Sequence, residues 1–182
     1  MLHTKKIVLM ALLGVSLNAF KFVLMYIPNV EVITLLIVVY TYVFGLNIGM
    51  VATLVFCTLE GLLFGFNPSW LLAYFIHWPT ICLVAAFLKK IKVTNPIIIG
   101  ICITAITALF GLQSTFTYFL LGKAIGRPNW VRNYWLLYLS GGVFYIVQCV
   151  SALLSIIFVF NPLYTLLTKL GKKYFNRPQN NL

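Results

Sequence analysis

The sequence predicts an all-α integral membrane protein, a six-transmembrane-helix bundle with both the N-terminus and the C-terminus in the cytoplasm. First, 62% of the 182 residues are hydrophobic and 8% are charged, whereas a soluble domain carries about a quarter charged residues. Second, the apolar residues form six runs, most of them near the ~20 residues that a helix needs to cross the hydrocarbon. Third, lysine and arginine gather in alternate connections between these runs. Because the connections are short, residues 1–182 are predicted to form a single transmembrane domain.

The six runs follow one another with breaks of different strength. The first follows Lys5-Lys6 and ends without a small-x-small cleavage pattern, so a membrane span is expected rather than a signal peptide. Only the weak break Gly45-Leu46-Asn47 separates the short second run from the third, which leaves either a short tilted span or part of a broken helix. The other breaks contain proline, which cannot continue a helix. The predicted spans are Ile7–Tyr26, Glu31–Phe44, Ile48–Phe64, Trp70–Leu88, Ile97–Leu121 and Trp135–Phe160.

The orientation follows from the distribution of cations. With the N-terminus inside, nine lysines and arginines fall in the inner segments and three in the outer segments, which is the usual positive-inside bias. The inner set is Lys5, Lys6, Lys89, Lys90, Lys92, Lys169, Lys172, Lys173 and Arg177, and the outer set is Lys123, Arg127 and Arg132.

Composition also excludes several classes of protein. A net charge of +11 would suggest nucleic-acid binding in a soluble protein, but these cations flank apolar runs, so no nucleic-acid partner is expected. The four cysteines lie inside apolar runs and lack metal-type spacing, so no metal or cofactor is expected. Motifs of metalloproteases, serine hydrolases and P-loop ATPases are missing, so the chain is not expected to be an enzyme.

Polar residues within the apolar runs are the first candidates for function, because a charge in the membrane is costly. Glu31, Glu60, His77 and Gln113 all fall in the predicted outer half of the bundle, and Lys21 lies at the same level. Their convergence favours a binding site open to the outside. A structural alternative remains, in which Glu60 and Lys21 neutralise each other and the amides connect helices.

The predicted outer loop 122–134 is the second anomaly, because it carries cations on the face where they are normally depleted. Lysine and arginine can hold phosphate or carboxylate, and aromatic rings can stack on flat ligands. The alternative is an interfacial belt in contact with lipid headgroups. The candidates are Lys123, Arg127, Trp130, Arg132 and Tyr134, with Trp70 in the preceding outer loop.

Two motifs resemble those of a known family. Residues 27–34 read IPNVEVIT and residues 61–70 read GLLFGFNPSW. They resemble the I-P-N-V-x-x-x-T and G-x-x-x-G-x-x-x-x-W patterns of the substrate-binding (S) components of energy-coupling factor (ECF) transporters, of the cobalamin and queuosine-precursor type. The resemblance implies six helices that capture substrate on the extracellular side, with Asn29, Glu31 and Trp70 in the matching motifs.

The same resemblance implies partners and a location. An S component docks onto a transmembrane coupling subunit that is attached to two cytoplasmic ATPases, in the plasma membrane of a prokaryote. The family's A-x-x-x-A docking pattern is altered here, since Val15 stands four residues after Ala11. Ala11 and Gly14 form the nearest small surface, and they could pack against a partner or within the bundle.

The leading hypothesis is therefore a non-enzymatic binding subunit of a vitamin importer. A cationic, aromatic loop favours a large, partly anionic cargo such as cobalamin, although riboflavin or a deazapurine would also suit aromatic loops. A self-sufficient secondary transporter or small channel is the alternative, and it would need acids near the midplane, whereas both glutamates lie toward the outside. A membrane enzyme or scaffold is the third possibility.

Overall fold

The computed structural model describes residues 2–27, 30, 32–123 and 125–175, with no account of the side chains of residues 2, 3, 174 and 175. The described residues form eight helices and no strand. In chain order these are α1 (Leu2–Leu24), α2 (Ile33–Phe44), α3 (Leu46–Phe64), α4 (Pro68–Lys90), α5 (Pro96–Thr107), α6 (Phe110–Leu121), α7 (Trp130–Ser140) and α8 (Gly142–Phe175).

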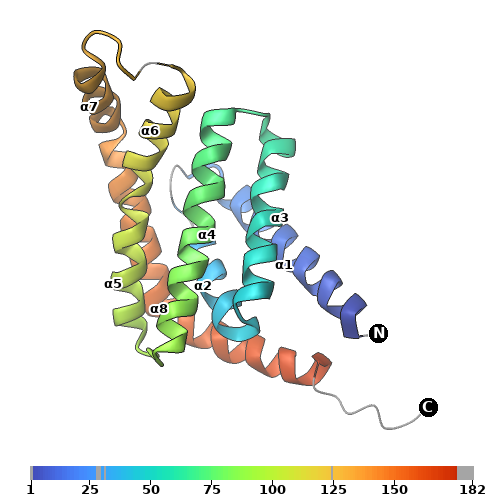
Figure 1. Ribbon diagram of the computed structural model, residues 1–182. Helices are drawn as coiled ribbons and strands as arrows, with labels where there is room; N and C mark the ends of the chain where they lie inside the picture. Colours follow the sequence, from blue (N-terminus) through green and yellow to red (C-terminus); the bar gives the residue numbers. More distant parts are fainter. Residues whose placement is uncertain (1, 28–29, 31, 124, 176–182) are drawn as a thin grey trace.

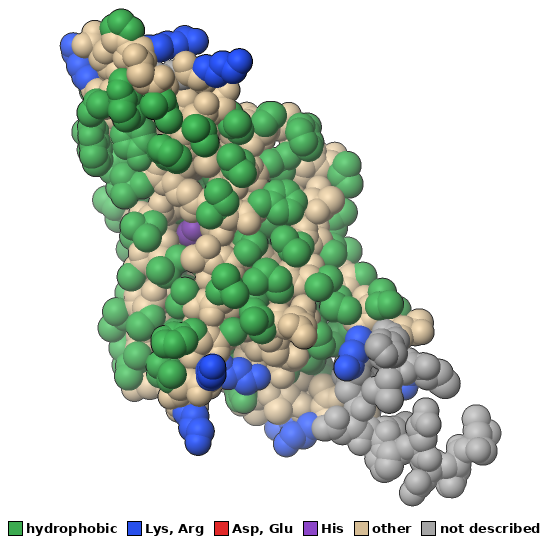
Figure 2. Space-filling model, in the orientation of Figure 1, with side chains coloured by type: hydrophobic (Ala, Val, Ile, Leu, Met, Phe, Trp, Pro, Cys, Tyr) green, Lys and Arg blue, Asp and Glu red, His purple; other side chains and the backbone are tan. Residues whose placement is uncertain are grey.

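The surface of the bundle is suited to lipid. Five described helical segments are long and apolar enough to cross a membrane, with α5 and α6 taken together as one. Large apolar side chains such as Val23, Leu62 and Phe158 are more than 70% exposed. Figure 2 shows hydrophobic side chains over the middle of the molecule, with lysine and arginine at its two ends. The chain is a helical membrane protein, as its composition predicts.

Helix α2 is the centre of the bundle rather than an ordinary span. Ten consecutive residues, from Ile33 to Tyr42, are buried, and α2 packs against α1, α3, α4 and α8. A helix that is apolar on every side is expected to be enclosed by others. With 12 residues it is about 18 Å long, too short to cross ~30 Å of hydrocarbon alone. Where the sequence predicts six spans, the described residues therefore form five helical segments of spanning length and the short, apolar α2.

Helix bounds differ by a few residues from most of the predicted spans, and two predicted spans are each divided between two helices. The span predicted as residues 97–121 is divided into α5 and α6 at Ala108 and Leu109, which keep near-helical dihedral angles. The span predicted as residues 135–160 is divided at Gly141, where a Cβ would lie 2.6 Å from the Tyr145 hydroxyl oxygen. Tyr145 therefore packs into space that only glycine leaves open. The break at Gly141 thus coincides with the packing of one tyrosine ring, which an apolar run alone does not reveal.

Helix α8 continues well beyond the predicted end at residue 160. It has 34 residues and contains Pro162, so it is about 51 Å long, against ~30 Å of hydrocarbon. Proline is the usual cause of a sharp kink, and Figure 1 shows the last part of α8 crossing the lower end of the bundle. We call residues 162–175 the arm of α8.

The connections lie at two opposite ends of the bundle. The start of α1, the end of α8 and the α4–α5 connection lie at the lower end in Figure 1, whereas the α3–α4 and α6–α7 connections lie at the upper end. We call these the lower and upper ends. Helix α4 begins at Pro68 and α5 at Pro96, where the asparagine before each proline accepts hydrogen bonds from the first backbone N–H groups. These two starts agree with the Asn-Pro breaks in the sequence.

Candidate functional site

The start of α4 places three aromatic residues on one face. Asn67 Oδ1 accepts hydrogen bonds from the backbone nitrogens of Ser69 and Trp70, at 3.1 and 3.3 Å. This N-cap sets where the helix begins. Residues four apart on a helix lie above one another, so Trp70, Tyr74 and Trp78 form a continuous column. The centroid distances between successive rings are 4.3 and 5.6 Å.

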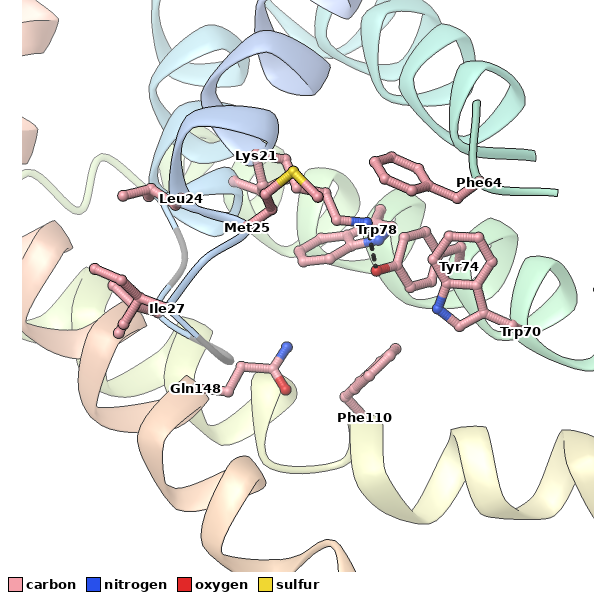
Figure 3. A pocket seen from close by; sticks show the side chains of 12 residues that line it. Lys21, Leu24, Met25, Ile27, Phe64, Trp70, Tyr74, Trp78, Phe110 and Gln148 are labelled. Carbon is pink, nitrogen blue, oxygen red and sulfur yellow. Dashed lines mark hydrogen bonds between the residues drawn. The ribbon is translucent and has the colours of Figure 1, made fainter. Parts of the chain in front are cut away.

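This column forms one wall of a cavity of about 320 Å³ in the upper half of the bundle. Figure 3 shows the aromatic side chains of α4 on one side, with Gln148 and Phe110 facing them and with Leu24 and Ile27 at one edge. The cavity thus combines residues from the first, middle and last parts of the chain. Its lining residues are Lys21, Leu24, Met25, Ile27, Val30, Ile33, Phe64, Trp70, Tyr74, Trp78, Phe110 and Gln148.

Lys21 supplies the positive charge of the cavity. Its Nζ atom forms an ion pair and hydrogen bond with Glu60 Oε2 and donates a hydrogen bond to the Tyr74 hydroxyl at 3.3 Å. It also lies 5.0 to 5.1 Å from the ring centroids of Phe64, Trp70 and Tyr74, within range of cation–π attraction. Four neighbours therefore hold one ammonium group in place.

Glu60 balances this charge from below the cavity surface. Its side chain is fully buried, whereas the side chain of Lys21 is 27% exposed. A buried charge is tolerated when it is paired, so the two residues form one neutral unit with only the lysine toward the cavity. The site consequently offers aromatic faces, one ammonium donor and the Gln148 amide, with little net charge.

Unpaired polar atoms gather around the same region. Six buried side-chain oxygen or nitrogen atoms lack a hydrogen-bond partner among the described residues, and four of them belong to Asn18, Glu60, His77 and Trp78. Most buried polar atoms in proteins are paired. Several hydrogen-bond donors and acceptors in this part of the bundle therefore remain unused by the described residues.

Some of the residues predicted from sequence lie at this site. Trp70 lines the cavity, and Glu60 lies behind Lys21. His77 is buried beside it, with its ring 4.8 Å from that of Phe110. Gln113 instead connects α6 to α4, because its Nε2 donates to the Ala73 carbonyl at 3.0 Å. The predicted residues Asn29 and Glu31 lie outside the described residues.

The cationic residues near the α6–α7 connection do not line the cavity. Lys123 and Arg127 are exposed in the connection, whereas Trp130, Arg132 and Tyr134 belong to α7 rather than to the loop predicted for residues 122–134. The Tyr134 hydroxyl donates to the Leu112 carbonyl at 2.8 Å. Burial raises the pKa of Tyr134, and the neighbouring tyrosines add to this effect, so the hydroxyl remains a donor. Tyr134 thus connects α7 to α6.

The two small residues of α1 differ in their surroundings. Gly14 is buried against α3, where a Cβ would lie 2.6 Å from Val55 Cγ1 and 2.9 Å from the Ala52 carbonyl oxygen. Ala11 is exposed. The sequence left open whether these residues pack against a partner or within the bundle. In this structure Gly14 packs within the bundle.

Several cavity residues were not selected from the sequence as ligand contacts. Tyr74, Trp78, Phe64 and Phe110 all line the cavity. The four-residue spacing of Trp70, Tyr74 and Trp78 was a readable signal, since it predicts one aromatic face on the same helix as His77. Phe110 carries no such signal, because its position depends on how α6 packs against α4.

Comparisons with family models, curated proteins and solved structures found no match to this chain. The resemblance to S components therefore rests on the two sequence motifs. The site itself is defined by its geometry: a membrane-embedded, aromatic cavity with one paired lysine at its surface.

Proposed function

We propose that this protein is the substrate-binding (S) component of an ECF-type importer, and that the cavity captures a vitamin or related micronutrient. The aromatic cavity around Lys21 carries the proposal. Ligand sites are typically concave and mostly apolar, with a few polar groups that orient the ligand. The protein itself would not hydrolyse ATP, and transport would depend on a coupling subunit and two partner ATPases.

The cavity favours a small, flat cargo over a corrinoid. At about 320 Å³ it is at the lower end of the range for small-molecule sites, ~300–1,000 Å³, and a cobalamin macrocycle with its side groups is far larger than one ring system. Aromatic rings stack on planar heterocycles, and the lysine can donate to a carbonyl or carboxylate on the ring. A riboflavin-like or deazapurine-like molecule fits this chemistry better than cobalamin.

The proposed topology is six membrane segments in a prokaryotic plasma membrane, with both chain ends in the cytoplasm. The start of α1, the end of α8 and the lower end of α4 lie at the same end of the bundle (Figure 1). The last turn of α4 carries Lys89 and Lys90, which supports this orientation through the positive-inside rule. The cavity would then face the extracellular side, as capture requires.

Tryptophan fluorescence provides the test, because the four tryptophans divide into two matched pairs. Trp70 and Trp78 line the cavity, whereas Trp130 and Trp135 lie on α7. We would titrate the detergent-purified chain with riboflavin, queuosine precursors, thiamine and cobalamin, and measure affinity by calorimetry beside the fluorescence. One member of the panel should bind tightly and quench the fluorescence.

The paired variants locate the bound molecule. Quenching should persist in Trp130→Phe/Trp135→Phe and largely disappear in Trp70→Phe/Trp78→Phe. Lys21→Met should lower the affinity at least tenfold, as expected for a lost charged hydrogen bond, whereas Arg127→Met should not. The opposite pattern would place binding at the α6–α7 connection and contradict a cavity site. Uptake into liposomes by the chain alone would support the secondary transporter instead.

A further inference from the structure

A second concave surface lies at the lower end, away from the cavity. A groove of about 520 Å³ runs between α1 and the arm of α8. Val8 and Leu12 on α1 face Leu167 and Leu170 on the arm, and Phe44 at the end of α2 provides the third side. We call this the basal groove. Apart from Thr4 and Lys5 near the start of α1, its lining has no polar side chain, which suits a hydrocarbon chain.

The groove is continuous with the lipid-facing surface. Val8 is 51% and Leu12 is 62% exposed, so the wall on α1 is also part of the outer surface of the bundle. A chain of the surrounding lipid could therefore enter from the side without any helix moving.

Polar and cationic groups lie at one edge of the groove. An adjoining hollow of about 360 Å³ shares Phe44 and Gly171 with the groove and adds Lys6, Lys172 and Thr168. Lys6 and Lys172 are exposed, and the buried Thr168 hydroxyl oxygen has no hydrogen-bond partner among the described residues. Phosphate oxygens accept hydrogen bonds from ammonium and hydroxyl groups such as these.

Among the described residues, no acidic side chain is paired with Lys6 or Lys172. The sequence contains two glutamates and no aspartate. Glu60, the glutamate among the residues that the structure describes, pairs with Lys21 at the cavity. The positive charge at the groove is therefore available for a partner from outside the chain.

We propose that the basal groove is a binding site for an anionic phospholipid. One acyl chain would occupy the apolar groove, and the headgroup phosphate would lie against Lys6, Lys172 and Thr168. Charge complementarity selects an anionic headgroup over a zwitterionic one, because basic pockets between membrane helices attract anionic lipids. The site does not depend on the proposed cargo or on the ECF partners.

The test uses the full chain purified in a neutral detergent, with bound lipid counted by native mass spectrometry. We would titrate phosphatidylglycerol and phosphatidylcholine with identical acyl chains. Phosphatidylglycerol should bind more tightly. The double variant Lys6→Gln/Lys172→Gln should lower its affinity about thirtyfold, since each lysine near an anionic lipid contributes a factor of about five.

A matched control removes the same charge from the same end of the molecule. Lys92 and Lys169 line neither the groove nor the hollow, so Lys92→Gln/Lys169→Gln should keep the affinity. A third variant, Gly171→Leu, fills the groove without a severe clash, because a Cβ there would meet Phe44 Cε1 at 3.4 Å as its nearest neighbour. It should also weaken phosphatidylglycerol binding.

Three results would overturn the site. Equal affinity for the two lipids would remove the role of the lysines. An equal loss in the Lys6/Lys172 and Lys92/Lys169 variants would indicate diffuse attraction to a basic surface. Unchanged affinity for phosphatidylglycerol in both the Lys6/Lys172 variant and Gly171→Leu would show that the lipid does not bind in the groove. The groove would then be expected to bind something else, such as a helix of a partner subunit.

Discussion

At the scale of single residues, the Lys21–Glu60 pair combines two roles that the sequence presents as alternatives. The pair is structural, because each charge stabilises the other inside the bundle. It also prepares the cavity, since the buried glutamate holds the lysine beside three aromatic rings. Neutralisation and ligand contact are therefore compatible in one residue.

Removing one member of this pair should be worse than removing both. Glu60→Leu leaves an unpaired ammonium and should lower the free energy of unfolding by about 3 kcal/mol or more. Lys21→Met/Glu60→Leu should recover most of that loss. A thiol-reactive dye can follow thermal unfolding, because Cys57 and Cys82 are buried in the folded bundle. If the double variant were no more stable than Glu60→Leu, the two charges would not be coupled.

At the scale of helices, close packing between α1 and α3 depends on Gly14, which has no side chain. Gly14→Ala would bring a Cβ to 2.6 Å from Val55 Cγ1 and 2.9 Å from a backbone oxygen. The helices must then separate, at a cost of about 1–3 kcal/mol. Gly142→Ala is the control, because a Cβ there meets nothing within 4 Å. The midpoint of thermal unfolding should fall for Gly14→Ala and stay level or rise for Gly142→Ala.

The two asparagine N-caps permit a second comparison between helices. Asn67→Ala and Asn95→Ala should each destabilise the protein by about 1 kcal/mol, because each removes a helix cap. Only the cap at Asn67 holds the turn that carries Trp70. Calorimetry with the ligand should therefore show weaker binding for Asn67→Ala alone. Equal ligand affinity in both variants would mean that the cavity does not depend on this helix start.

Local chemistry explains which parts of the helix pattern were predictable. Asn-Pro pairs set the starts of α4 and α5, and composition predicted an all-helical membrane protein. The break at Gly141 was not predictable, since it depends on where the Tyr145 ring packs. The continuation of α8 beyond Pro162 was also missed. A proline in the sequence can mark either a kink within a helix or the end of a helix, and the sequence alone does not distinguish the two. At the cavity, Glu60 and Trp70 were readable from sequence, whereas Phe110 was placed by tertiary packing.

At the scale of the whole molecule, the two ends of the bundle carry different binding surfaces. The upper half holds the aromatic cavity, and the lower end holds the basal groove with Lys5, Lys6 and Lys172. This polarity matches the proposed direction of capture, from outside toward a cytoplasmic motor.

Cysteine labelling in intact cells would check the orientation. Thr94 lies in the α4–α5 connection and Arg127 in the α6–α7 connection, and both are exposed. In a background without the native cysteines, Arg127→Cys should react with a membrane-impermeant maleimide. Thr94→Cys should react only after permeabilisation. The reverse pattern would invert the proposed topology and place the cavity on the cytoplasmic side.

The enclosure of α2 also constrains how the protein is made. During synthesis the ribosome delivers helices in order, yet α2 packs against α8, which follows all the other described helices. Until α8 has been inserted, the side of α2 that will contact it faces lipid or the insertion machinery. A 12-residue helix is also too short to span the bilayer by itself. The core is therefore complete only after α8 has been synthesised. A chain cut before α8 would be a substrate for quality control rather than a smaller version of the protein.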